Sequence, residues 1–272
     1  MPELPEVETV RRGLEEALRR KPKIIKFEFN RKDLRDPMPI RQIQKLVGEV
    51  ITSIERRAKY LVLRTEKGSL LSHLGMTGTW REAKPGEERL HDHIYIHFEG
   101  GLRLAYRDPR RFGILDFIEV GKDDEHPRLK HLGFEPLTDA FTGEALWKSL
   151  RGKAVAIKVA IMDQKIVVGV GNIYASEALF KAGIRPTTAS LKVSREKSIQ
   201  LVKSIQEILQ ASIAAGGSSI SDYEKFSGES GYFQERFNVY DRKDLPCVSC
   251  GRKIRAQILG GRNTYWCSTC QK

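Results

Sequence analysis

Apolar residues follow two different periods along the chain. Near the N-terminus, Val7, Val10, Leu14 and Leu18 recur every three or four positions with charged residues between them, which predicts an amphipathic helix. From about residue 24 to residue 120 the period is two, as in strands with one buried face. The helical period returns in the second half of the chain. The sequence therefore predicts a β-rich segment that lies between helical ones.

The β-rich segment contains two clear hairpins. In the first, strands at 60–65 and 69–73 flank a turn that contains glycine, and in the second, strands at 93–98 and 102–106 flank a Gly-Gly turn. Glycine adopts the left-handed backbone conformations that short hairpin turns require. Several antiparallel pairs in one segment favour a β-sandwich or a β-barrel.

The second half of the chain predicts four helices. The longest, at 195–215, places Leu201, Ile205 and Leu209 on one face. It ends at Gly216-Gly217, because glycine disfavours the helix. The other three helices are expected at 146–150, 154–162 and 172–182.

Composition and charge restrict the class of protein. The chain has 272 residues, 40% of them hydrophobic, which is enough for two domains with their own cores. Lys and Arg total 47 against 35 Asp and Glu, a net charge of +12. A basic balance of this size favours a polyanionic partner, above all nucleic acid, over a merely solubilising surface. The acidic N-terminus has no signal peptide, and no apolar run reaches membrane-spanning length, so we expect a cytosolic protein.

All four cysteines lie in the last 26 residues. Cys247-Val-Ser-Cys250 and Cys267-Ser-Thr-Cys270 are separated by 16 residues, which is the spacing of a four-thiolate zinc site. Four thiolates leave no ligand position open, so the metal is expected to be structural. Four unrelated buried thiols are the alternative. A module this small needs the metal for much of its stability.

The segment between the cysteine pairs predicts a hairpin. Strands at 254–259 and 263–266 would flank Gly260-Gly261 and place Arg262 near the tip. A guanidinium at such a tip can reach a phosphate. An ordinary surface arginine is the alternative.

The N-terminus carries a second candidate for chemistry. Removal of Met1 would expose Pro2 as a secondary amine, and an α-amino group titrates near pH 8. Such an amine can attack a carbon that bears two heteroatoms, with Glu3 and Glu6 as proton carriers. A solvated tail that begins a helix, with Pro5 in the first turn, is the alternative.

Two loops are individually weak indicators of phosphate binding. Gly169-Val-Gly-Asn172 precedes a predicted helix, and the start of a helix attracts anions. Asn172 could cap that helix or contact a phosphate, although this segment by itself favours the alternative of a tight turn between two helices. In the second loop, Arg110 and Phe112 combine a cation with an aromatic ring that could enter a base stack. The alternative is that Phe112 packs inward.

Taken together, these residues resemble the bacterial formamidopyrimidine-DNA glycosylases, and the resemblance runs from Pro2 to Lys272. Its most specific parts are the Pro2–Glu6 start, the segment 168–180 and the cysteine module 247–270. The resemblance implies a glycosylase that excises oxidised purines from duplex DNA and then cuts the strand at the abasic site. Pro2 would attack the sugar C1′, Glu3 would carry protons, and Glu6 would support the site.

The resemblance also implies three sets of DNA-contacting residues, and it implies one structural zinc on the four cysteines. The first set grips the backbone around the everted nucleotide, the second lines the DNA, and the third fills the gap in the duplex. These sets are Lys59, Asn172 and Arg262; His91 and Lys158; and Met76, Arg110 and Phe112.

The fold expected on this basis is α+β and multi-domain. An N-terminal antiparallel β-sandwich flanked by helices would span residues 1–135 and carry the catalytic residues. A helix-two-turn-helix domain would follow at 136–236 and include a lesion-side loop at about 218–232. A β-hairpin zinc finger would occupy 237–272. The hinge is expected around Pro127–Leu137, and the protein is expected to act as a monomer on double-stranded DNA in the cytoplasm and nucleoid.

Four positions depart from the usual pattern of the family: Phe134, Ser221, Asp241 and Asn263. Ser221 bears on lesion preference, because relatives often have a cation there. Two other functions compete with the favoured one. The first is a preference for oxidised pyrimidines, as in the sister endonuclease VIII group. The second is a catalytically silent DNA-binding protein, against which Pro2, Glu3 and Glu6 argue, since binding alone needs none of them.

Overall fold

The computed structural model describes residues 2–218 and 233–272. These residues divide into two compact units, one formed by 2–130 with 216–218 and the other by 131–215 with 233–272. No helix in the described part of the chain is both long enough and apolar enough to cross a membrane.

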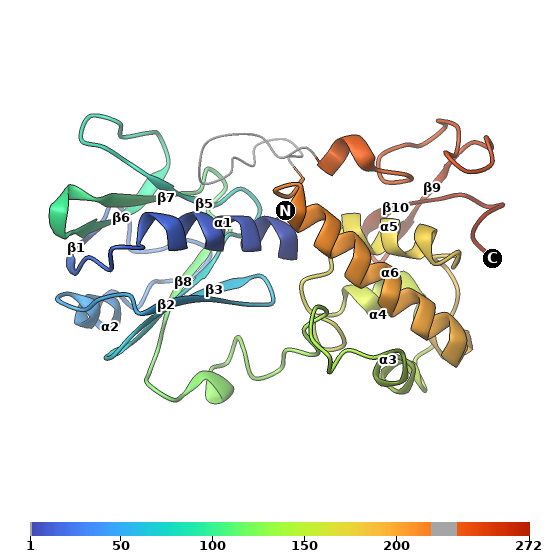
Figure 1. Cartoon of the computed structure of the whole chain (residues 1–272), viewed down its shortest axis with the longest axis horizontal. Helices are drawn as coiled ribbons and strands as arrows, with labels where there is room; N and C mark the ends of the chain where they lie inside the picture. Colours follow the sequence, from blue (N-terminus) through green and yellow to red (C-terminus); the bar gives the residue numbers. More distant parts are fainter. Residues whose placement is uncertain (1, 219–232) are drawn as a thin grey trace. The chain divides into compact units, whose positions relative to one another are not determined.

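The first unit contains two four-stranded antiparallel sheets (Figure 1). One sheet has the strand order β1-β6-β7-β5 and the other β2-β3-β4-β8. Helix α1 contacts strands of both sheets. The predicted β-sandwich and both predicted hairpins, β3–β4 and β6–β7, are confirmed. The bounds are α1 Leu4–Ala17, β1 Ile24–Phe29, α2 Ile40–Ile43, β2 Ser53–Arg57, β3 Tyr60–Thr65, β4 Gly68–His73, β5 Thr79–Glu82, β6 Asp92–Phe98, β7 Arg103–Arg107 and β8 Ile114–Ile118.

The apolar stripe of α1 joins the core of this unit. Val7, Val10 and Leu14 are fully buried in one cluster with Leu61 of β3 and Trp80 of β5. The indole N–H of Trp80 donates to the Ser72 hydroxyl at 3.0 Å, so the one polar atom of that side chain is satisfied. The helix that begins at the N-terminus is therefore fixed to the core of the first unit.

The second unit is helical and contains the four predicted helices. They are α3 Gly143–Leu150, α4 Ile157–Met162, α5 Asn172–Lys181 and α6 Arg195–Ala214. Leu201, Ile205 and Leu209 of α6 are buried as predicted, and α6 packs on α3 and α5. Helix α4 begins three residues later than predicted, because the backbone of Val155 and Ala156 pairs instead with the segment 189–190.

A two-stranded antiparallel hairpin ends the chain. Strands β9 Arg255–Leu259 and β10 Arg262–Trp266 agree with the prediction to within one residue. Strand β10 packs on α5. The predicted helical domain and β-hairpin module are thus both present in the second unit. Five short 3-10 segments complete the described structure: 44–46, 99–101, 123–125, 190–192 and 233–236.

Candidate active site and DNA-binding residues

The N-terminal residues form a buried start to helix α1. Glu3 is the N-cap, Pro5 lies in the first turn, and the Glu3 and Glu6 side chains are each only 2% exposed. Pro2 is buried as well. The alternative of a solvated tail is therefore wrong. Carboxyl groups are rarely buried without partners, so this concentration of acid beside Pro2 indicates a built site.

Glu6 connects the start of α1 to the segment that follows α6. One of its carboxylate oxygens accepts from the backbone N–H of Glu3 at 2.8 Å. The other accepts from the backbone N–H and the hydroxyl of Ser218 at 2.8 and 2.9 Å. Gly217 has a φ of +81°, and a Cβ there would lie 3.2 Å from the same oxygen of Glu6. The Glu6 carboxylate thus fixes the backbone beside Pro2, and this close approach explains the glycine.

Hydrogen bonds from Arg56 hold the turn that carries Lys59. Lys59 is 6% exposed and follows Ala58, whose φ of +56° is unusual for a residue with a Cβ. Arg56 donates to the Ala58 carbonyl at 3.0 Å and to Glu8 of α1 at 3.3 Å. Burial opposes ionisation of Glu8, but Arg11 and Arg56 outweigh it and lower the Glu8 pKa. Arg56 therefore links the turn that carries Lys59 to helix α1, which begins next to Pro2.

His73, on the neighbouring strand β4, is held neutral. Burial is the main cause that lowers its pKa to about 3, and the charge of Lys59 adds to the shift. Its Nδ1 accepts from the Gly75 backbone N–H at 3.0 Å. At neutral pH His73 therefore adds no charge beside Lys59.

Two loops of the first unit lie against each other and present Met76, Arg110 and Phe112. Gly75, at φ +63°, approaches the Phe112 backbone so closely that a Cβ would lie 2.4 Å from it. Phe112 is 42% exposed, so the alternative of an inward-packed ring is wrong. The Arg110 guanidinium lies 4.9 Å from the centre of that ring. Met76 is half-buried and is absent from the buried core.

A buried carboxylate makes these loops rigid. Asp108 is fully buried and accepts from the Thr77 hydroxyl at 2.8 Å and from the Gly113 N–H at 2.7 Å. Its backbone N–H donates to the carbonyl of His91 at 3.0 Å. This hydrogen bond places His91, whose φ is +75°, beside the loops that carry Met76 and Arg110. Nothing in the sequence pattern indicated the roles of Asp108 and Thr77.

The second unit brings Asn172, Lys158 and the hairpin together. The Lys158 ammonium donates to the side-chain oxygen of Asn172 at 2.6 Å, to the Asn263 carbonyl at 3.0 Å and to the Thr264 hydroxyl at 2.7 Å. Asn172 is the first residue of α5, and Gly171 is the N-cap, so of the two roles considered for Asn172 the N-cap is wrong. Arg262 is exposed at the start of β10.

Lys158 itself is 1% exposed, so all but a trace of its surface is covered by protein. Next to it, Gly260 approaches Val159 of α4, where a Cβ would lie 3.1 Å from the Val159 side chain. Three segments, α4, the start of α5 and β10, therefore meet at one ammonium group.

Sequence reasoning missed Glu177. This carboxylate on α5 is 2% exposed and accepts from the backbone N–H groups of Asn238, Val239 and Tyr240 at 2.8 to 2.9 Å. It orders the chain that leads into the cysteine module. An acidic residue on the apolar face of a predicted helix was the signal that could have revealed it.

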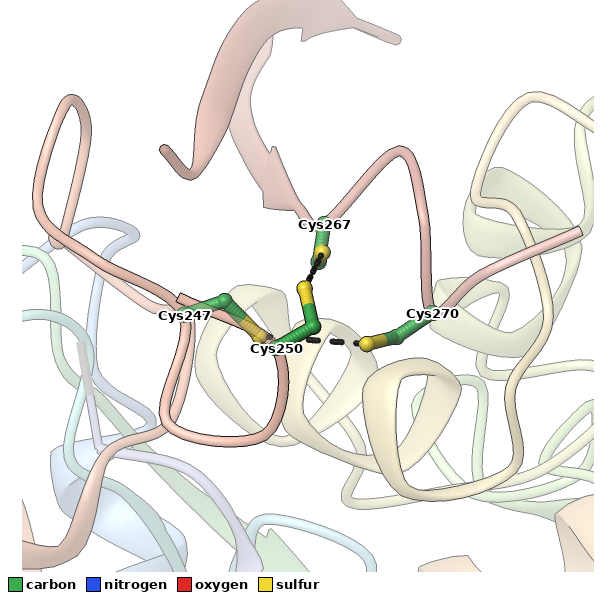
Figure 2. Close-up of side chains that lie close together, drawn as sticks. All are labelled: Cys247, Cys250, Cys267 and Cys270. Carbon is green, nitrogen blue, oxygen red and sulfur yellow. Dashed lines mark hydrogen bonds between the residues drawn. The ribbon is translucent and has the colours of Figure 1, made fainter. Parts of the chain in front are cut away.

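The four cysteines converge at the end of the chain (Figure 2). Their sulfur atoms lie within 4.8 Å of one another, with 3.4 Å between Cys250 and Cys267 and 3.9 Å between Cys247 and Cys270. Tetrahedral coordination with Zn–S bonds of about 2.3 Å requires sulfurs about 3.8 Å apart. The cluster therefore fits one structural zinc, as predicted.

The protein surroundings also favour a thiolate in this cluster. Burial opposes ionisation of Cys267, but backbone N–H groups and two other cysteines lower its pKa to about 7. Burial and the other thiols raise the pKa of Cys270 to about 12. A metal would have to displace the remaining protons.

Three descriptions of known protein families match successive parts of the chain. These are the N-terminal domain of formamidopyrimidine-DNA glycosylase over residues 1–115, the H2TH domain of the same enzyme over 132–224, and a zinc finger found in FPG and IleRS over 244–272. Together with the fold, they define a DNA glycosylase that has a helix-two-turn-helix domain and a zinc finger.

Individual proteins agree over the full length. The formamidopyrimidine-DNA glycosylase of Bdellovibrio bacteriovorus is 64% identical over 272 residues, and that of Syntrophotalea carbinolica is 45% identical over 276 residues, with all of each chain covered. The crystal structure of MutM (Fpg) from Thermus thermophilus superposes with a TM-score of 0.89 at 36% identity, covering 99% of this chain and 98% of that one. MutM in complex with carbocyclic 8-oxo-G DNA gives a TM-score of 0.90 at 36% identity, with both chains fully covered. The chain belongs to the formamidopyrimidine-DNA glycosylase family.

Proposed function

We propose that Pro2 is the nucleophile with which this chain removes oxidised purines from DNA. The chain is a bifunctional glycosylase of base excision repair, which releases the damaged base and then cuts the strand as an AP lyase. The observation that carries the assignment to Pro2 is the burial of Glu3 and Glu6 beside it. Burying two acids has a desolvation cost, and their position beside the amine suits proton transfer, which DNA binding without catalysis does not need.

The chemistry proceeds at the sugar carbon C1′. The Pro2 nitrogen donates its electron pair to C1′ while the bond from C1′ to the base breaks, and the proton that the nitrogen then gives up leaves with the base. Glu3 protonates the ring oxygen as the sugar opens to a cationic Schiff base. That cation acidifies the C2′ proton, so β-elimination expels the 3′ phosphate and δ-elimination expels the 5′ phosphate. Hydrolysis then frees Pro2. Removal of Met1, which lies outside the described residues, is a condition of this sequence.

The other residues hold the DNA in the geometry that this reaction needs. A base inside a duplex is unreachable, so the nucleotide must be everted and the gap filled. The exposed Phe112 and the adjacent Arg110 and Met76 are suited to fill it, because the buried Asp108 makes their loops rigid. Lys59, Asn172 and Arg262 would grip the phosphates beside the everted nucleotide, with His91 as a further contact.

We assign catalysis to residues 1–135 and DNA binding to the helical segment 136–236. Residues 237–272 would form the zinc finger, whose hairpin presents Arg262. The lesion-side loop, with Ser221, lies mostly outside the described residues. One chain carries every residue of the proposed reaction, which supports action as a monomer. The expected location is the cytoplasm, where the basic chain would be bound to the nucleoid through DNA.

Opposite-base preference tests the function directly. We expect 8-oxoguanine to be excised faster opposite cytosine than opposite adenine by roughly tenfold or more, because Arg110 can donate to the acceptors of cytosine and one such bidentate contact is worth about 1–3 kcal/mol. Arg110→Ala should flatten this preference and weaken binding. The measurement is single-turnover excision opposite each of the four bases, with thymine glycol as a competing lesion.

Arg111→Ala is the matched control, since it removes the same charge from the neighbouring exposed position and should leave the preference intact. Faster removal of thymine glycol than of 8-oxoguanine would transfer the chain to the pyrimidine-specific sister group. If both variants lost the preference for cytosine equally, Arg110 would not be the residue that recognises the opposite base.

Lys158 should act by holding the protein together. In Lys158→Met the acceptors on Asn172, Asn263 and Thr264 lose their donor, and an unsatisfied buried group such as the Thr264 hydroxyl costs about 1–3 kcal/mol. We expect the amides of β9 and β10 to exchange hydrogen faster in the DNA-free protein, and DNA binding to weaken. Lys153→Met, at an exposed position just before α4, is the control. Unchanged exchange in Lys158→Met with weakened binding would instead favour direct contact between Lys158 and DNA.

A further inference from the structure

A cavity on the zinc-bearing module is lined by an unusual excess of positive charge. Its volume is about 620 Å³, and its cationic side chains come from the turn after α5, the segments on either side of the first cysteine pair, and the start of β9. Among the described residues, a single carboxylate, that of Asp244, lines the same cavity. The cations are Arg185, Lys243, Arg252, Lys253 and Arg255.

These charges are not neutralised by the protein. All five cationic residues are exposed, and within the described residues none of them forms an ion pair, whereas cations such as Arg128 and Arg64 each bridge two carboxylates. Like charges gathered in this way repel one another, so the arrangement favours an anionic ligand.

An unpaired buried donor points to the same conclusion. Trp266 lines the cavity, is 4% exposed, and pairs directly across the hairpin with Arg255. Its indole N–H is buried and meets no acceptor among the residues that the structure describes. Leaving such a donor unsatisfied costs about 1–3 kcal/mol. An acceptor oxygen supplied by a ligand would recover this cost.

The lining favours the backbone of DNA over other anions. Trp266, the only aromatic residue among the described lining residues, is too deeply buried to stack on a base. The contacts left for a nucleic acid are those of the cations with phosphate oxygens, which carry no sequence information. The cavity's two large apolar side chains, Ile254 and Trp266, are at most 4% exposed, and the half-buried Ala256 offers one methyl group, so the apolar anchor of an acidic peptide finds little to contact. The volume is that of a ligand site and exceeds what one phosphate needs. Arg and Lys are the usual partners of phosphate oxygens.

We propose that this cavity is an additional phosphate site, which binds the sugar–phosphate backbone of DNA outside the lesion without reading its sequence. The site shares no residue with the set expected to grip the everted nucleotide. It rests on the proposed function only in that the substrate is DNA. It would add affinity for undamaged flanking DNA and leave the chemical step unchanged.

The test compares a triple variant, Arg252→Gln, Lys253→Gln and Arg255→Gln, with a control that removes the same charge elsewhere in the second unit, Lys148→Gln, Lys192→Gln and Lys203→Gln. Affinity for an undamaged duplex is measured against salt. The slope of log affinity against log salt should fall by about 0.9 for each lost phosphate contact, hence by about 2–3 in the first variant and by far less in the control. Zinc content and single-turnover excision at saturating enzyme should match the wild type.

The indole N–H of Trp266 gives an independent readout by nuclear magnetic resonance, with Trp266→Phe used to assign its signal. The signal should shift when undamaged duplex is added, and the shift should vanish in the triple variant. A shift with sodium phosphate but not with duplex would overturn the proposal in favour of a free anion, and a shift with polyglutamate alone in favour of a protein partner. An unchanged salt slope with normal excision would refute this site while leaving the glycosylase function intact. Absence of excision by the wild type would refute the function itself.

Discussion

Borohydride is expected to trap this chain covalently on DNA that contains 8-oxoguanine, through the nitrogen of Pro2. The reductant converts the Schiff base between Pro2 and C1′ into a stable amine. An uncleavable tag before Pro2 should abolish trapping, because it turns the amine into an amide without a free electron pair. Pro2→Gly retains a primary amine and should trap much more slowly. Mass spectrometry of the N-terminus and of the trapped peptide measures both outcomes.

The neighbouring acid should matter on a comparable scale. Glu3→Gln should slow excision by about 10²–10⁴-fold, the usual contribution of a positioned proton carrier. Glu16→Gln is the control, since it removes an exposed carboxylate from the same helix. Full trapping by the tagged protein would show that the nucleophile is another residue. Equal losses of excision rate in the two glutamate variants would show that the substitutions act by disturbing helix α1 and not by removing a proton carrier.

Local patterns were sufficient to predict the elements of the fold. The alternation of apolar residues fixed the hairpins β3–β4 and β6–β7, and the apolar stripe of α6 with its terminal glycines fixed the longest helix. Each of these signals is complete within a short window of sequence. The start of α4 was wrong because a distant segment, around residue 189, competes for its backbone, and no window around α4 contains that information.

The hydrogen bonds that support the candidate site could not be predicted either, because their partners are far apart in the sequence. Glu6 meets Ser218 across 212 positions, and Lys158 meets Thr264 across 106. Residue type and spacing, which are local properties, were enough to predict the cysteine cluster and to propose Pro2 and Glu3 as catalytic candidates. The local pattern could not reveal that the Lys158 ammonium is enclosed by the protein. The same pattern is found around a lysine on an exposed helix face and around one buried where α4, α5 and β10 meet.

Loss of the zinc should have the second large effect. Cys250→Ser is expected to lose the metal and unfold the β9–β10 hairpin, because the apolar cluster of the module is very small. Two of its five buried members, Cys247 and Cys267, are themselves metal ligands. Zinc binding in comparable modules is worth about 10–16 kcal/mol, which is as large as the net stability of a whole domain. Metal analysis and hydrogen exchange of the β10 amides measure the loss, and Ser249→Ala in the same turn is the control.

The damage should extend beyond the hairpin. Lys158 donates to Asn263 and Thr264 on β10 and to Asn172 on α5, so an unfolded hairpin takes the two β10 acceptors away from a buried ammonium. A buried charge in that state is costly, and the start of α5 would rearrange to expose it. Cys250→Ser should therefore weaken DNA binding more than Arg262→Ala does, since it displaces Asn172 as well as Arg262. Normal DNA binding by the metal-free variant would contradict this, and losses equal to those of Arg262→Ala would confine the effect of zinc to the hairpin.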